Sequence, residues 1–288
     1  MKIAYLIDSS ASINEDPSKN IYMVPLEIIE NLDKTEITYK AGIDIDIKTL
    51  SEKISKGATF KTGQSPIGVV EEKIKELLEK YDHIIGIPID RQLSGTYNSW
   101  QMLENQFGSN KFHVIDGLIV EQGIKFLIDE IEDYLKNNEY DIKKIDELIE
   151  KEKAKIIGVI VVNDVSQLVA GGRLKGWKAF LIKTLKIKIL IKLFAKDGLL
   201  EYFDKCRDDQ EAKQIALDYI DSQNNWKTKG IKRIGISTSI VDSKENEKIV
   251  EEYKKLLPKN IEIKWQHISS IIAVHTGMNG YAILIQSN

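Results

Sequence analysis

The sequence predicts an α/β protein of two domains, and three observations support this. First, the chain has 288 residues, whereas one domain typically takes roughly 100 to 200. Second, apolar β-type runs alternate with helical patterns through the first half, which is typical of βαβ units around a parallel sheet. Third, a different order of elements follows "IIGVIVV" (156–162). We therefore expect an N-terminal α/β domain with a mainly parallel sheet over 1–154, and a C-terminal α/β domain with a mixed sheet over 155–288.

Patterns of hydrophobicity predict the elements of the N-terminal domain. Continuous apolar runs such as "HIIGIPI" (83–89) indicate buried strands, whereas apolar residues every three or four positions indicate amphipathic helices. Asp44 or Asp46 is placed to cap the first helix. In chain order we expect a strand at 2–8, helices at 47–54 and from 67 to 81, a strand at 83–89, a helix after Ser94, a strand at 112–116, and helices at 121–135 and 141–153.

The C-terminal domain is expected to begin with the strand at 156–162 and to contain a β-hairpin. The hairpin is predicted because "KDG" (196–198) separates two β-type runs, and Asp-Gly suits a tight turn. The other expected elements are short helices within 164–186, a helix at 208–221, a strand at 231–237, a helix at 242–257, and strands at 261–266 and 281–286.

Composition excludes several classes of protein. The hydrophobic and charged fractions, 42% and 30%, are those of a folded globular chain. The longest apolar run has seven residues, far fewer than the roughly 20 of a membrane-spanning helix. The first residues read as a strand rather than a signal peptide, so we expect a cytoplasmic protein. A single cysteine, Cys206, and four scattered histidines predict neither a disulfide nor a metal site.

Short polar motifs follow several of the apolar runs, where binding groups collect in open α/β sheets. Ser94 in "LSGTYNS" has two compatible interpretations: it caps the next helix, or that helix N-terminus, with Gly95 allowing close approach, binds a carboxylate or phosphate. The stretch does not match a Gly-x-Ser-x-Gly nucleophile elbow. The motifs are "DSSAS" (8–12), "KTGQSP" (61–66), "LSGTYNS" (93–99), "GGRL" (171–174) and "AVHTGMNG" (273–280).

The other motifs also have structural alternatives. Thr62 could bond its own backbone in a turn, Arg173 could form a surface ion pair, and His275 could be a satisfied core residue. A Walker-type loop and a Gly-x-Gly-x-x-Gly fingerprint are absent from the sequence, so no nucleotide or other cofactor is expected.

Taken in order, these motifs resemble the DegV family of bacterial fatty-acid-binding proteins. The resemblance spans nearly the whole chain, and "LSGTYNS" is its best-preserved piece. In "TGQSP", Gly63 replaces the family's usual serine, and the Pro-Ser order is exchanged to Ser65-Pro66. The matching segments are "IAYLIDSSASI", "VPLEI", "YKAGIDID", "TGQSP", "LSGTYNS", "GGRL", "KDGLLEYFDKCR" and "AVHTGMNG".

The resemblance implies a two-domain α/β fold that encloses one long-chain fatty acid, with the carboxyl group near the domain junction. It also implies that a separate ATP-dependent kinase subunit phosphorylates the bound acid, so that this chain is a carrier rather than an enzyme. Arg173 and Arg207 match arginines suited to contact the phosphate or the kinase. The residues implied to bind the carboxyl group are Thr62, Ser94, Gly95, Thr96 and His275.

The basic stretch 173–196 suggests a second partner. It holds eight Lys or Arg residues and no acid, interleaved with aromatic and leucine side chains including Trp177 and Phe180. This composition suits an anionic membrane surface, and solvated lysines on an ordinary helix and strand are the alternative. No nucleic-acid partner is expected, because the net charge is −3 and no known nucleic-acid-binding motif is present.

A different class of function also stays open. In this alternative the chain is a hydrolase or transferase that uses Ser94 with His275 at the domain cleft.

Overall fold

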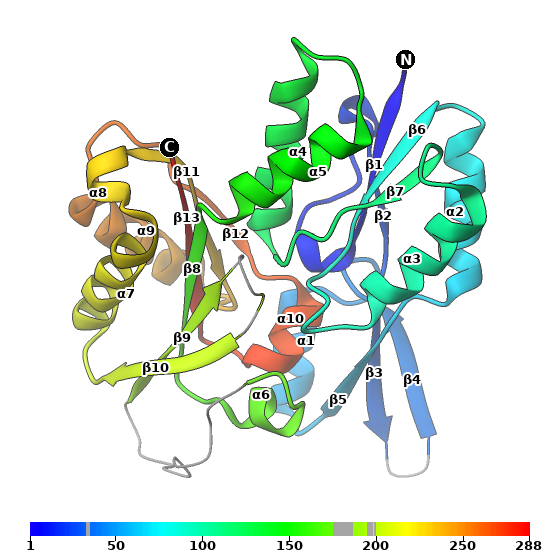
Figure 1. The fold of residues 1–288 in the computed structure, drawn as a ribbon. Coiled ribbons are helices and arrows are strands. Elements are labelled where there is room, and N and C mark those ends of the chain that lie inside the picture. Colours follow the sequence, from blue (N-terminus) through cyan, green and yellow to red (C-terminus); the bar gives the residue numbers. More distant parts are fainter. Residues whose placement is uncertain (33–34, 175–186, 195–197, 199) are drawn as a thin grey trace. The chain divides into compact units, whose positions relative to one another are not determined.

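The computed structural model describes residues 1–32, 35–174, 187–194, 198 and 200–288, and Figure 1 shows their path. The chain forms two compact units. Unit 1 contains Met1–Lys153 with Ser269–Ile271, and unit 2 contains Ala154–Ile268 with Ile272–Asn288. The α/β fold class predicted from the sequence is confirmed, because both units combine sheets with helices.

Unit 1 is built on a four-stranded parallel sheet in the order β2-β1-β6-β7. The strands expected at 2–8, 83–89 and 112–116 are present within two residues of their predicted ends, whereas the short β2 was not predicted. The strands are β1 (Ile3–Asp8), β2 (Ile21–Val24), β6 (His83–Ile87) and β7 (Phe112–Val114).

Five α-helices accompany this sheet in the described part of unit 1, and all five were predicted. Asp46, not Asp44, caps the first of them, since its carboxylate accepts a hydrogen bond from the Thr49 N–H at 2.7 Å. Asp44 instead accepts from the Lys40 N–H at 2.8 Å. The helices are α1 (Ile47–Ser55), α2 (Ile67–Leu78), α3 (Thr96–Phe107), α4 (Gln122–Leu135) and α5 (Ile142–Lys153).

Close packing of aromatic rings fixes α3 against the parallel sheet. Trp100 of α3 and Phe112 of β7 are buried, with ring centroids 6.1 Å apart. A Cβ atom at Gly86 of β6 would lie 2.8 Å from the Phe112 ring and 3.1 Å from the Trp100 ring. The glycine in "HIIGIPI" is therefore required for the two rings to lie directly on the sheet.

A separate three-stranded antiparallel sheet, in the order β4-β3-β5, makes unit 1 less purely parallel than the sequence predicted. Its strands are β3 (Glu27–Leu32), β4 (Thr35–Lys40) and β5 (Thr59–Gly63). Five of the six residues of the edge strand β4 are exposed, so its sequence lacks the apolar pattern that identifies a strand. Buried Glu30 connects this sheet to α1, because its carboxylate accepts from Tyr39 Oη at 2.7 Å and Lys53 Nζ at 2.9 Å.

Unit 2 contains a six-stranded mixed sheet in the order β10-β9-β8-β13-β11-β12. All of its pairings are antiparallel except β11 with β12. The hairpin expected around 196–198 is confirmed as the antiparallel pair β9 and β10, although residues 195–197 lie outside the described residues. The strands are β8 (Ile156–Val162), β9 (Lys188–Phe194), β10 (Leu200–Cys206), β11 (Ile231–Thr238), β12 (Lys264–His267) and β13 (Tyr281–Ser287).

The longer helices of unit 2 begin at aspartate caps. The Asp208 carboxylate accepts from the N–H groups at the start of α7, and Asp242 does the same for α9. α8 and α10 were not predicted, and the part of the expected helical region at 175–186 lies outside the described residues. The helices are α6 (Ser166–Ala170), α7 (Asp209–Asn224), α8 (Trp226–Lys229), α9 (Ser243–Leu256) and α10 (Ser270–Thr276), whose first two residues belong to unit 1.

Candidate functional site

The motif "LSGTYNS" lies at the N-terminus of α3, beyond the carboxyl end of β6. The helix begins at Thr96 and Gly95 occupies the N-cap position, so the expectation that Ser94 is the N-cap is wrong by one residue. The Ser94 hydroxyl still accepts a hydrogen bond from the Thr96 N–H at 3.3 Å. The two side-chain hydroxyls are hydrogen-bonded to each other at 2.9 Å. A pair of hydroxyls therefore lies at the positive end of a 12-residue helix, a suitable place for an anionic group.

Gly95 allows the motif "TGQSP" to contact the start of α3. A Cβ atom at Gly95 would lie 2.5 Å from Nε2 of Gln64. Gln64 also accepts a hydrogen bond through Oε1 from the Ser99 hydroxyl at 2.7 Å. Two motifs that are about thirty residues apart in the sequence thus meet in unit 1 through Gln64, a residue that the sequence analysis did not single out.

Thr62 approaches this region as part of a strand rather than a turn. It lies in β5 and is paired with Ile28 of β3, two residues before Gln64. Ser65 follows Gln64 and donates a hydrogen bond from its hydroxyl to the Pro25 carbonyl at 2.5 Å. The turn interpretation of Thr62 is therefore wrong, because the antiparallel sheet continues through Gly63.

The loop before α3 is held by two aspartates. The Asp8 side chain is fully buried, and its carboxylate accepts from the N–H groups of Ser10 at 2.8 Å and Ile89 at 2.7 Å. Burial raises the pKa of the Asp8 carboxyl, and these hydrogen bonds oppose the shift. Farther along, the Asp90 carbonyl accepts from the Leu93 and Ser94 N–H groups. Asp8 therefore joins the carboxyl ends of β1 and β6, and Asp90 fixes the backbone position of Ser94.

His275 lies in unit 2, where "GGRL" surrounds it. A Cβ atom at Gly171 would lie 3.0 Å from Nδ1 of His275 and 3.4 Å from Nη1 of Arg173. Burial, together with the Arg173 charge, lowers the pKa of His275 to about 4. The imidazole is therefore neutral at pH 7 and can donate or accept one hydrogen bond at each nitrogen without carrying charge.

The predicted phosphate-binding arginines have different surroundings. Arg173 is half-buried, and its Nη1 donates to the Gly171 carbonyl at 2.5 Å. Arg207 is exposed between β10 and the Asp208 cap of α7, and no residue in the described part of the chain forms an ion pair or hydrogen bond with its side chain. Its guanidinium can therefore bind an external anion without breaking an internal contact.

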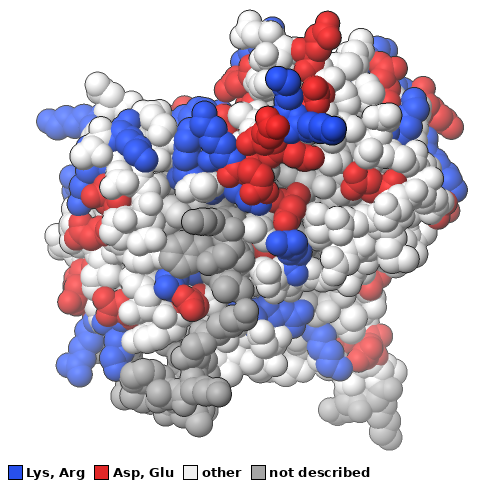
Figure 2. Space-filling view, viewed as in Figure 1, with Lys and Arg blue, Asp and Glu red and all other residues white. Residues whose placement is uncertain are grey.

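Most of the basic stretch 173–196 lies outside the described residues, including Trp177 and Phe180. Two of its lysines are described and form ion pairs, Lys188 with Asp209 at 2.9 Å and Lys192 with Glu201 at 2.6 Å. On the face of unit 1 that Figure 2 shows, acidic and basic side chains also lie next to one another over α4 and α5.

Among the described residues, no helix is long and apolar enough to cross a membrane. Within the same ranges, no group of three or more His, Cys, Asp and Glu side chains is arranged to hold a metal ion.

Histidine does form one buried charged cluster that the sequence analysis missed. His113 of β7 is bonded through Nδ1 to Glu104 of α3 and through Nε2 to Asp146 of α5, both at 2.8 Å. Burial of the ring disfavours its charge, but the two carboxylates outweigh burial and raise the pKa of His113 to about 9. The partners are 9 and 33 residues away in sequence, so spacing gave no signal for this cluster.

These features define a class of protein: a chain of two α/β units whose polar motifs carry hydroxyl, amide and imidazole groups. The chain belongs to the DegV family, since the family model described as "Uncharacterised protein, DegV family" matches residues 2–288. A relative from Mycoplasma genitalium, the DegV domain-containing protein MG450, is 37% identical over 290 residues, which covers 100% of both chains.

Solved structures show the same fold. A DegV family protein from Thermus thermophilus, described by its fatty acid binding, matches with a TM-score of 0.84 at 22% identity, covering 100% of both chains. DegV from Bacillus subtilis, described as a fatty acid binding protein, matches with a TM-score of 0.82 at 24% identity, again covering 100% of both chains. The predicted family and fold class are thus confirmed.

Proposed function

We propose that this chain binds one long-chain fatty acid and presents its carboxyl group to a separate ATP-dependent kinase subunit, which forms the acyl phosphate. Membership of the DegV family over the whole chain supports fatty-acid binding, and so does the description of two related structures as fatty-acid-binding proteins. The residues proposed to bind the carboxyl group are Thr62, Ser94, Gly95, Thr96 and His275.

The observation that carries this proposal is the hydroxyl pair of Ser94 and Thr96 at the start of α3. Within this pair one hydroxyl donates to the other, so the second hydroxyl can donate to a carboxylate, and the helix N-terminus adds a favourable partial charge. The neutral ring of His275 supports the same chemistry, because it can donate a hydrogen bond without forming an ion pair. A carboxylate held in this way keeps an oxygen that can attack a phosphoryl group.

Phosphoryl transfer depends chiefly on positioning and on stabilisation of charge, so a carrier and a kinase can divide the work. Arg207 is exposed with no side-chain partner in the described ranges, which suits a contact with phosphate or with the kinase. We assign the same role to Arg173. An anionic membrane surface that contacts residues 173–196 is the other partner we propose, and salt-dependent sedimentation with anionic liposomes tests it.

The alternative is a hydrolase or transferase that uses Ser94 of unit 1 with His275 of unit 2. The Ser94 hydroxyl is bonded to Thr96, and the described histidines of unit 1 have other partners. His83 contacts the Asn110 carbonyl, and His113 contacts its two carboxylates. A serine nucleophile needs a base within hydrogen-bond reach, and His83 and His113 have other partners, so this alternative depends on His275 of unit 2.

Mass spectrometry of lipid extracted from the purified chain tests the proposal directly. We expect one fatty acid per chain, and its consistent absence after expression in a lipid-replete host would refute the proposal. Ser94→Ala should then weaken fatty-acid binding by about 1 to 3 kcal/mol, because one donor to the carboxyl group is lost.

Ser55→Ala is the matched control for this variant. Ser55 is an exposed serine of α1 whose hydroxyl donates to the Glu52 carbonyl. This control should leave the affinity unchanged. Equal affinities of the Ser94 and Ser55 variants in a fluorescent fatty-acid displacement assay would restrict Ser94 to a structural role at the helix start.

A further inference from the structure

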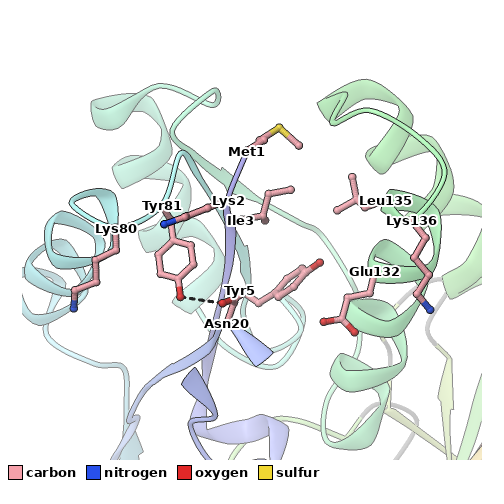
Figure 3. Close-up of a pocket in the computed structure, with 10 residues that line it drawn as sticks. All are labelled: Met1, Lys2, Ile3, Tyr5, Asn20, Lys80, Tyr81, Glu132, Leu135 and Lys136. Atoms are coloured by element: carbon pink, nitrogen blue, oxygen red, sulfur yellow. Dashed lines mark hydrogen bonds between the residues drawn. The ribbon is translucent and has the colours of Figure 1, made fainter. Parts of the chain in front are cut away.

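A pocket lies in unit 1, at the opposite end of the parallel sheet from the loops described above. It has a volume of about 640 Å³ and is lined by the start of β1 and by residues of α4. Figure 3 shows its lining side chains, with those of β1 and α4 facing each other. Its size is within the range of small-molecule sites, roughly 300 to 1,000 Å³.

Tyr5 places a polar group in this pocket without a partner. Its side chain is only 4% exposed, yet no residue in the described part of unit 1 forms a hydrogen bond with its hydroxyl. Figure 3 shows the hydroxyl directed toward the side chains of α4. Burial raises the pKa of the phenol, so the hydroxyl keeps its proton at neutral pH. With no protein partner among the described residues, this hydroxyl is available for a hydrogen bond with a ligand in the pocket.

Glu132 of α4 faces Tyr5 across the pocket. Figure 3 shows its carboxylate directed back toward β1, and no lysine or arginine of the described residues lies within ion-pair distance of it. Burial raises the pKa of the Glu132 carboxyl, while the more distant Lys125 and Lys136 oppose the shift. The ionised form thus lacks a close cation that would compensate for its partial loss of water.

Three of the neighbouring lysines have carboxylate partners of their own. On α4, Lys125 forms an ion pair with Asp129, and Lys136 forms one with Asp133 at 2.7 Å. Lys80 pairs with Glu76 at 3.0 Å, and Lys2 lies on the Tyr81 side of the pocket in Figure 3. These lysines therefore surround the pocket but do not neutralise Glu132.

The walls next to these two polar groups are apolar. Ile3 of β1 and Leu135 of α4 both line the pocket, and Figure 3 shows them facing each other above Tyr5 and Glu132. A ligand that fits this arrangement has a positively charged hydrogen-bond donor at one end and a short hydrocarbon chain at the other.

We propose that this pocket binds a small aliphatic amine. The protonated amine donates one hydrogen bond to the Glu132 carboxylate and another to the Tyr5 oxygen, and its alkyl chain packs between Ile3 and Leu135. Charge-assisted hydrogen bonds of this kind are about twice as strong as neutral ones. The site is separate from the proposed fatty-acid function and does not depend on it.

Titration of the full chain with pentylamine, followed by amide chemical shifts, tests the proposal. We expect saturable shifts in β1 and α4, and an affinity about tenfold higher than that of pentanol, which has the same chain but no charge. Pentyltrimethylammonium keeps the charge but cannot donate hydrogen bonds, so its affinity should lie between those of pentylamine and pentanol. Equal affinity for pentylamine and pentanol, or shifts elsewhere in the chain only, would overturn the proposal.

Two conservative variants assign the contacts. Glu132→Gln should lower the affinity for pentylamine by about tenfold, and Tyr5→Phe by about threefold, because each removes one partner of the ammonium group. Glu147→Gln, the same change at an exposed position of α5, is the control and should have no effect. If the Glu132 and Glu147 variants bind pentylamine equally well, the amine does not contact Glu132 and the proposal is wrong. Measurement of unfolding for each variant shows that the fold is intact.

Discussion

The two ends of the parallel sheet in unit 1 differ in whether their polar side chains have hydrogen-bond partners within the protein. At the carboxyl end, the fully buried Asp8 carboxylate accepts two backbone hydrogen bonds, and the Ser94 and Thr96 hydroxyls are bonded to each other. At the amino end, the Tyr5 hydroxyl and the Glu132 carboxylate have no such partners among the described residues. The two ends are joined by β1, which carries Tyr5 and finishes at Asp8.

The difference indicates which polar groups maintain the fold and which are free to bind. A buried group with internal partners costs stability when it is removed, because its partners lose their hydrogen bonds. A group without partners costs little to remove, but its loss changes what the pocket can bind. The stability of single variants therefore separates the two ends of the sheet.

Asp8→Ala should produce the largest effect. It removes the acceptor of two buried N–H groups, those of Ser10 and Ile89, so we expect the free energy of unfolding to fall by roughly 2 to 5 kcal/mol. Urea-induced unfolding followed by circular dichroism measures this change. Asp8→Asn keeps one acceptor oxygen, so its free energy of unfolding should fall by less than that of Asp8→Ala. If Asp8→Ala lowers the free energy of unfolding by less than an average surface substitution does, the Asp8 hydrogen bonds are not needed to join β1 and β6.

The His113 cluster is a second buried group with internal partners, and its contribution to the free energy of unfolding should depend on pH. His113 is 7% exposed, and its folded-state pKa is raised to about 9 from 6.5. Because the folded pKa lies above the unfolded one, the stabilisation is fully present below pH 6.5 and is lost as the pH rises toward 9. Its size is at most about 3 kcal/mol. We expect wild-type stability to fall across this window and the His113→Gln variant to show a flatter profile there.

Unfolding in urea at several pH values measures the difference between these two proteins. His83→Gln is the control, since His83 contacts a backbone carbonyl and an aromatic ring rather than carboxylates. If the free energies of unfolding of wild type and His113→Gln change in parallel between pH 6.5 and 9, the two carboxylates do not raise the pKa of His113.

Glu132→Gln should have the smallest effect on stability. The carboxylate has no ion pair or side-chain hydrogen bond with the described residues, so we expect the free energy of unfolding to change by no more than about 0.5 kcal/mol. Thermal unfolding by calorimetry is sensitive enough to measure it. A loss approaching that of Asp8→Ala would contradict the contrast between the two ends and would indicate that Glu132 has a structural partner.

Much of the fold could be predicted from local sequence patterns. Apolar runs located β1, β6, β7, β8 and β13, helical spacing located α1 to α5, and one of the two proposed aspartates, Asp46, is the cap of α1. The strands β2 to β5 were missed, because β2 is short and β4 exposes nearly all of its residues. An exposed edge strand needs no apolar alternation, so its position depends on the neighbour with which it pairs.

The sequence by itself determined the α/β class, the positions of the strongly patterned strands and helices, and the motifs that the chain shares with the DegV family, because each of these depends on residues close together in the chain. The tertiary structure alone decided that Gln64 contacts Gly95 and Ser99, that His113 joins Glu104 to Asp146, and that Tyr5 faces Glu132. These groups are separated by up to 127 positions in the printed numbering. Contacts over such separations depend on how strands and helices pack, which no local periodicity encodes.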